Sequence, residues 1–379
     1  MLLTPEQEAV RAAARAFAEA EIAPHAAEWD RAEGAPRALY ERMAAVGLMG
    51  MLVDQQWGGS GLDVTSYVLA IEEISAADGG VSNVMAANNS PVAAAIAQHG
   101  TEQQRRDHLT KLTSGEWIGS FHLTEPHTGS DAAAITTRAV RDGDEWVLNG
   151  TKAFITSGSL SDVAMIVAVT NPAAGKRGIS CFITRTDNPG YRVIAKERKL
   201  GHRTNDTCQV AFDDLRIPAT DLLGEEGRGL GIALANLSLG RIGVAAQAVG
   251  GARAALAAAL RYAKERRTFG RPIIDHQAIL FRLAEMDTEI EAARQLYLHA
   301  AARRDAGLDC AREASMAKLF ASEVAERVAS AAIQIHGGAG FLNDFPVEKL
   351  YRDVRVYQIY EGTSEVQKLM IARYLDEAR

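Results

Sequence analysis

The sequence predicts an α+β multidomain protein: an N-terminal helical domain, a middle β domain and a C-terminal bundle of long helices. Residues 1–117 keep the helical period of 3.6 residues. Residues 118–224 are rich in Val, Ile, Thr and Phe, with turn dipeptides between short runs. Residues 225–379 return to the helical period in stretches long enough for an antiparallel bundle. A chain of 379 residues is also too long for one simple core, which favours two or three packed domains.

The N-terminal part carries a clear helix start. Thr4 can cap a helix, Pro5 suits its first position, and Gln7 completes a capping box. Helical periodicity continues over 65–76, 81–99 and 102–112, and the Gly-Gly-Ser-Gly segment at 58–61 is expected to be a loop.

The middle part has frequent turn signals between short segments, whereas the C-terminal part has long uninterrupted helical segments. Turn signals at Asp142-Gly143 and Asn149-Gly150 favour short strands, and 137–148 is expected to form a hairpin. Long helices are expected over 230–267, 277–305 and 311–335, with a last helix after Gly362.

Composition excludes several classes of function. The net charge is −7 and no basic cluster exceeds a few residues, so a nucleic-acid role is not expected. No uninterrupted apolar stretch reaches the length of a membrane span. The three cysteines lie far apart, which favours reduced buried thiols, and residues 1–20 show no signal-peptide pattern. We therefore expect a cytoplasmic protein.

Common catalytic motifs are absent. The Gly-rich segment 224–231 imitates a dinucleotide-binding loop, but no βαβ unit surrounds it, which favours a flexible helix entry. The nine histidines show no metal-ligand spacing, so no metal is expected. His122 and His127 are unusual in their turn, and the sequence offers no explanation for them.

Three Gly-containing polar turns, at 121–131, 154–158 and 334–340, adjoin apolar strands or helices. This pattern suits a large planar ligand that approaches the backbone, although each turn alone is ordinary loop chemistry. Glu361 lies just before the last helix, where it fits either a favourable helix-dipole residue or a catalytic base.

These segments, with the rest of the chain, resemble the acyl-CoA dehydrogenase family, closest in motifs to its short-chain (butyryl-CoA type) members. The matching pieces follow the order of the family: WGGSG at 57–61, LTEP at 123–126, LNGTKAFITS at 148–157, KLG at 199–201, LGEEG at 223–227, RRTFGRP at 266–272, QIHGG at 334–338, YRD at 351–353 and IYEGTSE at 359–365. The resemblance implies an N-terminal helical domain, a β-barrel-like middle domain and a four-helix bundle, assembled as a homotetramer.

The resemblance also implies the reaction, which is FAD-dependent α,β-dehydrogenation of an acyl-CoA to the trans-2-enoyl-CoA. Electrons would pass to an electron-transfer flavoprotein. Glu361 would be the base, polarisation of the thioester carbonyl would stabilise the developing enolate, and the flavin would take the β-hydride. Burial would raise the pKa of Glu361 towards neutrality.

The resemblance carries over further residues position by position. The FAD-binding positions are Phe121, Leu123, Thr124, Gly129, Ser130, Phe154, Ile155, Thr156, Arg266, Phe269, Gln277, Gln334, Ile335, Gly337, Gly338, Thr363, Ser364 and Glu365. Of these, Arg266, Gln277 and the 334–338 segment would contact FAD of the neighbouring subunit. The substrate-binding positions are Ser130, Ser238, Leu239, Arg241 and Gly362.

Three positions depart from common family patterns. Gly240 carries no carboxylate where branched-chain members place their base, Ser238 stands where Asp is common, and Phe154 stands where Trp is common. Two other activities on this fold stay open: an acyl-CoA-dependent lyase or desulfinase, and a flavin oxidase or monooxygenase. The chain length of the acyl group depends on a few pocket side chains and is not determined by these motifs.

Overall fold

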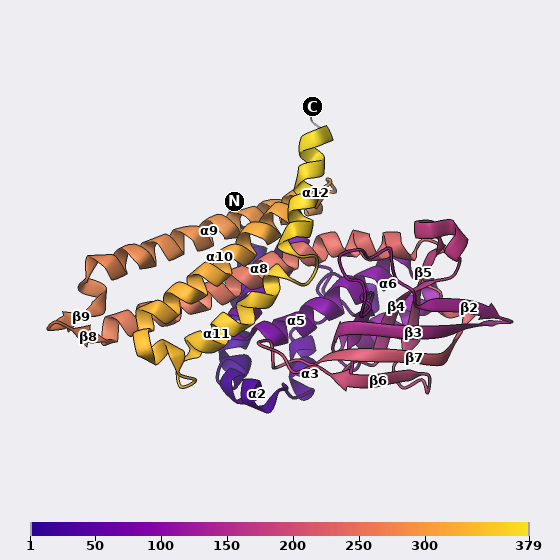
Figure 1. Ribbon diagram of the computed structural model, residues 1–379, viewed down its shortest axis with the longest axis horizontal. Coiled ribbons are helices and arrows are strands. Elements are labelled where there is room, and N and C mark those ends of the chain that lie inside the picture. Colours follow the sequence, from indigo (N-terminus) through magenta and orange to yellow (C-terminus); the bar gives the residue numbers. More distant parts are fainter. Residues whose placement is uncertain (1, 378–379) are drawn as a thin grey trace.

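The computed structural model describes residues 2–377. In Figure 1 the long C-terminal helices run side by side towards one end of the molecule, and the sheet lies at the other end. The N-terminal helices pack between the bundle and the sheet. One long helix, α8 (Gly229–Glu265), extends from the sheet into the bundle. The predicted order of helices, β domain and helices is confirmed.

The N-terminal helices form as the capping signals indicate. Gln7 N donates to Thr4 Oγ1 at 3.2 Å and Thr4 N donates to Gln7 Oε1 at 3.0 Å, which completes the capping box. The helices are α1 (Pro5–Phe17), α2 (Ala26–Ala32), α3 (Ala38–Ala45), α4 (Val64–Ala77), α5 (Gly79–Ala87), α6 (Ala94–His99) and α7 (Glu102–Thr113).

The helix expected over 81–99 is interrupted. Ser90 is extended (φ −147°, ψ 121°) because Pro91 disfavours the helical conformation in the residue before it. Asn88 and Asn89 lie in this break, and their side-chain amides donate to the backbone oxygens of Met49 and Leu48 at 2.9 and 2.8 Å. The interruption thus anchors the loop after α3.

The middle domain is a mixed sheet with strand order β1-β4-β2-β3-β7-β6, and β5 pairs with β4. The strands are β1 (Gly119–His122), β2 (Arg138–Asp142), β3 (Glu145–Thr156), β4 (Val163–Val169), β5 (Ile179–Arg185), β6 (Tyr191–Lys196) and β7 (Thr207–Pro218). The predicted hairpin is confirmed as β2 and β3, whereas β1 and β4 pair in parallel.

Strand β4 is buried on both faces. Val163, Met165 and Val167 pack with apolar residues of the N-terminal helices and α8, whereas Ala164 and Ile166 pack inside the curve of the sheet. A strand that is covered on both faces has a continuous apolar sequence, and β4 has one.

The C-terminal helices are α8 (Gly229–Glu265), α9 (Gln277–Asp305), α10 (Ala311–His336), α11 (Pro346–Val354) and α12 (Ser364–Glu377), and a small hairpin of β8 (Arg267–Thr268) and β9 (Arg271–Pro272) joins α8 to α9. Of these helices, α8, α9 and α10 match the expected ranges to within two residues and α12 follows Gly362 as expected, whereas α11 was not predicted. Figure 1 places this hairpin at the end of the bundle farthest from the sheet.

The expectation that no segment could span a membrane needs correction for α8. By length and composition, this helix alone among those described is apolar enough to cross a bilayer. However, 67% of its most apolar window is buried inside the protein, where it packs against α4 and α10. It is therefore the core helix of the bundle.

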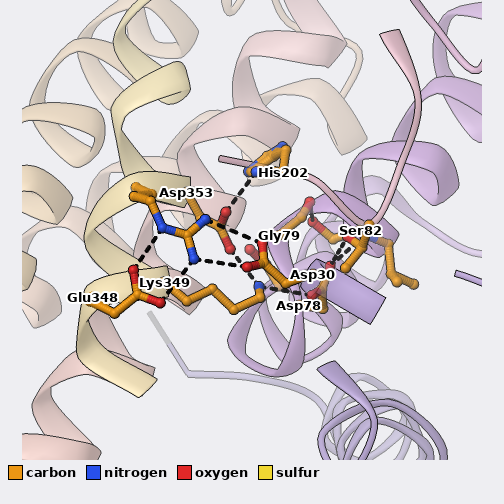
Figure 2. Close-up of polar contacts among 12 residues, drawn as sticks. Asp30, Asp78, Gly79, Ser82, His202, Glu348, Lys349 and Asp353 are labelled. Atoms are coloured by element: carbon orange, nitrogen blue, oxygen red, sulfur yellow. Dashed lines mark hydrogen bonds and ion pairs between the residues drawn. The ribbon is translucent and has the colours of Figure 1, made fainter. Parts of the chain in front are cut away.

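Buried ion pairs connect α11 to both other domains (Figure 2). Lys349 Nζ donates to Asp78 Oδ2 at 2.9 Å and to Asp353 Oδ2 at 2.6 Å, and Asp353 Oδ1 accepts from His202 N at 2.6 Å. Arg352 pairs with Asp30 at 2.8 Å.

We call the residues Asp78, His202, Lys349 and Asp353 the interdomain clamp. Since α11 leads into the loop that carries Glu361, the clamp fixes the start of that segment.

His202 makes the clamp sensitive to acid. Burial lowers the pKa of His202 to about 4, compared with about 6.5 in an unfolded chain. Between these values the unfolded chain binds a proton that the folded chain excludes, so this contribution to stability is present above pH 6.5 and lost as the pH falls towards 4.

We therefore expect His202→Asn to be less stable than the wild type at pH 7.5, and the difference to shrink steadily towards pH 4.5. Asn tolerates the left-handed backbone of this position (φ +50°). Thermal unfolding of both proteins across this range is the measurement, and a gap that stays constant with pH would contradict the assignment.

Candidate active site

Glu361 lies in a strained loop between a 3-10 turn (Arg355–Gln358) and α12. Its φ is +57° and that of Gly362 is +94°, so two consecutive residues are left-handed. A non-glycine residue in this region costs on the order of 1 kcal/mol and persists only where its surroundings enforce it.

Three side chains from other elements hold this loop. Lys318 Nζ on α10 donates to Gly362 O at 2.7 Å, and Gln367 Nε2 on α12 donates to the same oxygen at 2.8 Å. Next to the loop, Tyr360 OH donates to Gln247 Oε1 on α8 at 2.5 Å. The left-handed conformation of Glu361 is thus enforced from three helices.

The carboxyl group of Glu361 lies directly over Gly240. A Cβ atom built at Gly240 would be 2.8 Å from Glu361 Oε2, which is closer than real Cβ contacts. Any side chain at position 240 would therefore displace the carboxyl group. The sequence carries no carboxylate at position 240. The structure shows that the glycine there leaves room for the Glu361 carboxyl group.

Burial raises the pKa of Glu361 to about 7, even though the cations of Arg241 and Lys318 act in the opposite direction. Among residues 2–377, Glu361 Oε2 has no hydrogen-bond partner. A buried carboxyl group with a pKa near neutrality and a free oxygen is suited to take a proton from a ligand.

Other polar atoms near the base are also unsatisfied. Arg241 Nε, Ser364 Oγ and Gln367 Oε1 are buried without a partner in the described part of the chain. Because buried polar groups are normally hydrogen-bonded, a cluster of such atoms indicates a site that a ligand completes.

The β domain presents an exposed aromatic ring. Phe154, at the end of β3, is 67% exposed and has a φ of +58°. Ala153 N donates to Thr124 O at 2.9 Å, which places the loop after β1 beside this ring. Thr156 Oγ1 accepts from Asn83 Nδ2 at 3.3 Å, which connects the same turn to α5. The sequence-predicted positions Thr124, Phe154 and Thr156 therefore lie together.

Family models match almost the whole chain in three consecutive pieces. They are the N-terminal, middle and C-terminal domains of acyl-CoA dehydrogenases, at residues 4–116, 120–215 and 227–375. The chain belongs to the acyl-CoA dehydrogenase family.

Individual relatives agree with this assignment. The short-chain specific acyl-CoA dehydrogenase of Clostridium acetobutylicum is 44% identical, with 98% of each chain covered. The structure of butyryl-CoA dehydrogenase from Megasphaera elsdenii superposes with a TM-score of 0.97 at 41% identity, and 99% of each chain is covered. A chain in a structure of the electron transferring flavoprotein of Acidaminococcus fermentans has the same TM-score and coverage at 44% identity. A glutaryl-CoA dehydrogenase from Mycobacterium smegmatis in complex with FADH2 gives a TM-score of 0.94 at 32% identity, with 99% of this chain and 95% of that chain covered.

In this acyl-CoA dehydrogenase the predicted site residues fall into three groups. The first is the group on the β domain around Phe154, and the second comprises Glu361 and Gly362 with Leu239 and Arg241 of α8. The third, the distal group, lies at the distal end of the bundle and comprises Arg266, Phe269, Gln277, Gln334, Ile335, Gly337 and Gly338. The stretch of α8 from Arg241 to Glu265 is about 36 Å long, so one chain does not bring the distal group to Glu361.

Apart from Ile335, which is buried, the distal group is open to solvent. Phe269 is 95% exposed, and a Cβ built at Gly337 or Gly338 would meet nothing within 4 Å. Gln334 lines a surface hollow of about 500 Å³ together with Arg282 and Arg327. Both an exposed ring and an open glycine backbone are suited to contact a further molecule.

Sequence reasoning missed Lys318. It lies fully buried on α10, beside the alanines and serines of the face that packs into the bundle. A lysine on an otherwise apolar helical face was the available signal, because lysine is almost never fully buried without a partner.

His122, which the sequence left unexplained, is a core residue of the β domain. Its Nε2 lies 2.8 Å from Ser120 Oγ, and its ring packs edge-on against Tyr191. Burial lowers its pKa to about 3, so the ring is neutral. His127 is exposed and its Nε2 lies 3.2 Å from Ala134 O.

The close contact at Gly240 yields a direct test. In Gly240→Ala the new methyl group meets the carboxyl group of Glu361, and we expect kcat to fall at least about tenfold because the base is misplaced. Gly231→Ala on the same helix is the matched control, because a Cβ there would meet nothing within 4 Å. Equal rates for the two variants would show that the contact does not matter for catalysis.

Proposed function

We propose that this enzyme removes the α-proton of a short-chain acyl-CoA with Glu361 as the base, and that the β-hydride passes to FAD to leave the trans-2-enoyl-CoA. The buried Glu361 carboxyl group over Gly240, with a pKa of about 7 and an unpaired oxygen, carries this proposal. The backbone N–H of Glu361 belongs to the same enforced loop and can donate to the thioester carbonyl.

The residues present fit FAD. Phe154 offers an exposed aromatic wall beside Thr124 and Thr156, and Ser364 Oγ is a buried atom that lacks a partner within residues 2–377. When bound, FAD supplies the two-electron acceptor that a protein side chain lacks. The relative bound to FADH2 supports the same cofactor for this chain.

A complete site requires a second subunit in this proposal. The distal group of one chain would contact the diphosphate and adenosine end of FAD held by its neighbour, since it lies about 36 Å along α8 from the base. Phe269 and the open backbone at Gly337 and Gly338 are the surfaces that such a contact would cover. We propose a homotetramer on this ground and on the family pattern.

The proposals of a short-chain substrate and of an electron acceptor are supported by the names of relatives. The Clostridium acetobutylicum and Megasphaera elsdenii proteins are named for short-chain or butyryl-CoA substrates. The Acidaminococcus fermentans structure supports an electron-transferring flavoprotein as the acceptor.

Anaerobic titration of the purified flavoprotein with butyryl-CoA tests the proposal. Bleaching of the flavin band with a long-wavelength charge-transfer band is the expected result. Octanoyl-, isobutyryl- and glutaryl-CoA, titrated in parallel, would rank the substrates. A protein that binds FAD but is reduced by none of these thioesters would contradict dehydrogenation, and a protein that binds no FAD would contradict the whole proposal.

A further inference from the structure

We propose that Lys318 is a positioning residue that holds the Glu361 loop in its left-handed conformation and supplies a cation that keeps the base ionised. This inference rests on the proposed function of Glu361. Lys318 lies on α10, 44 positions before the glycine whose backbone it contacts.

The first observation is geometric. Lys318 is fully buried, and among the described residues its ammonium group makes one hydrogen bond, to Gly362 O at 2.7 Å. That oxygen is the carbonyl oxygen of the residue that directly follows the base. Gln367 Nε2 donates to the same oxygen, and also to Glu361 O at 3.3 Å. The two donors therefore hold the backbone on the C-terminal side of Glu361, because both bind the carbonyl oxygen of Gly362 and Gln367 also binds that of Glu361.

The second observation concerns charge. Across residues 2–377, no carboxylate lies within ion-pair distance of Lys318. A buried ammonium group without a counter-ion is costly, and a nearby carboxylate offsets that cost. Glu361 is the carboxylate that stabilises the charged form of Lys318 most, followed by Glu365 on α12.

The interaction is reciprocal, because Lys318 and Arg241 both stabilise the charged form of Glu361. Burial acts in the opposite direction and brings the pKa of both Glu361 and Lys318 to about 7. The other groups that face this pair are Arg241 from α8, Tyr67 from α4 and Tyr360 from the loop itself. Of these, only Arg241 adds a positive charge.

The consequence is a division of roles. Burial makes Glu361 a stronger base, whereas the two cations keep its pKa below the value that burial alone would give, so that part of it stays ionised at neutral pH. When Glu361 takes a proton, the ammonium group of Lys318 loses its counter-charge, so the two groups titrate as a coupled pair.

Three variants separate the hydrogen bond from the charge. Lys318→Met removes both, Lys318→Gln retains a donor without the charge, and Lys318→Arg retains the charge. Lys368→Met, an exposed lysine on α12, is the matched control. For each protein we would measure kcat, KM, the acid limb of the kcat profile against pH, and the thermal unfolding temperature.

We expect Lys318→Met to lower kcat at pH 7 at least about tenfold with little change in KM, and to move the acid limb upward by about one pH unit or more. In Lys318→Gln the acid limb of the kcat profile should move upward by the same amount. In Lys318→Arg the acid limb should lie close to that of the wild type, and Lys368→Met should match the wild type in all four measurements. An acid limb that stays in place in the Met and Gln variants would overturn the proposal, whether or not those variants lose thermal stability.

A second measurement is independent of turnover. Infrared difference spectra between the wild type and Glu361→Gln report the protonation of the Glu361 carboxyl group as the pH is varied. The same titration in the Lys318→Met background should have a higher midpoint, and an unchanged midpoint would overturn the proposal. If no thioester reduces the wild-type flavin, the proposed function fails, whereas this titration still tests Lys318.

Discussion

Glu361→Gln is expected to lower the rate of flavin reduction by an acyl-CoA about 10³-fold or more while FAD remains bound. The amide has nearly the same size as the carboxyl group, so it fits the space over Gly240, but it cannot accept the α-proton. A positioned general base contributes roughly 10²- to 10⁴-fold, and here no second carboxylate replaces it at position 240.

Stopped-flow reduction by butyryl-CoA under anaerobic conditions measures this effect, and the flavin spectrum before mixing reports cofactor content. Glu225→Gln, in the exposed loop before α8, is the control and should reduce at the wild-type rate. If Glu361→Gln retains a tenth of the wild-type rate, Glu361 is not the base.

Lys349→Met is expected to be the most destabilising single substitution in the interdomain clamp. The ammonium group of Lys349 is the only cation that contacts both Asp78 and Asp353 within the described residues, and both carboxyl groups are buried. Removal of one partner from a buried ion pair costs about 3–5 kcal/mol, because the remaining charges stay in a medium of low polarity.

Denaturant unfolding of the wild type and the variant measures this cost. The control is Arg106→Met, which removes a surface ion pair with Glu102 whose two side chains are 65% and 67% exposed. That pair should contribute less than about 1 kcal/mol. A cost for Lys349→Met as small as that of the control would show that the clamp does not support the folded state.

The double variant Lys349→Met, Asp353→Asn refines the test. Since it removes the buried charges of both partners, it should be more stable than the sum of the two single effects predicts. Strict additivity would indicate that the two residues act independently, in conflict with the 2.6 Å contact between them.

The sequence by itself determined the order of the three domains, the boundaries of the long C-terminal helices and the family. Helical periodicity and caps are local signals, so α9 begins and ends where expected, at Gln277 and Asp305. The β2–β3 hairpin followed from its Asp142-Gly143 turn for the same reason. The motif around Glu361 identified the candidate base because its residues are consecutive in the chain.

Only the tertiary structure decided how that base is prepared for its reaction. The carboxyl group of Glu361 meets Gly240, and the carbonyl of Gly362 meets Lys318, across long separations in the chain. The pKa of a carboxyl group depends on burial and on charges that packing brings near it. Neither can be predicted from the local periodicity of the sequence. For the same reason the sequence did not show that Arg266 and Gln334 lie at the distal end of the bundle, away from Glu361.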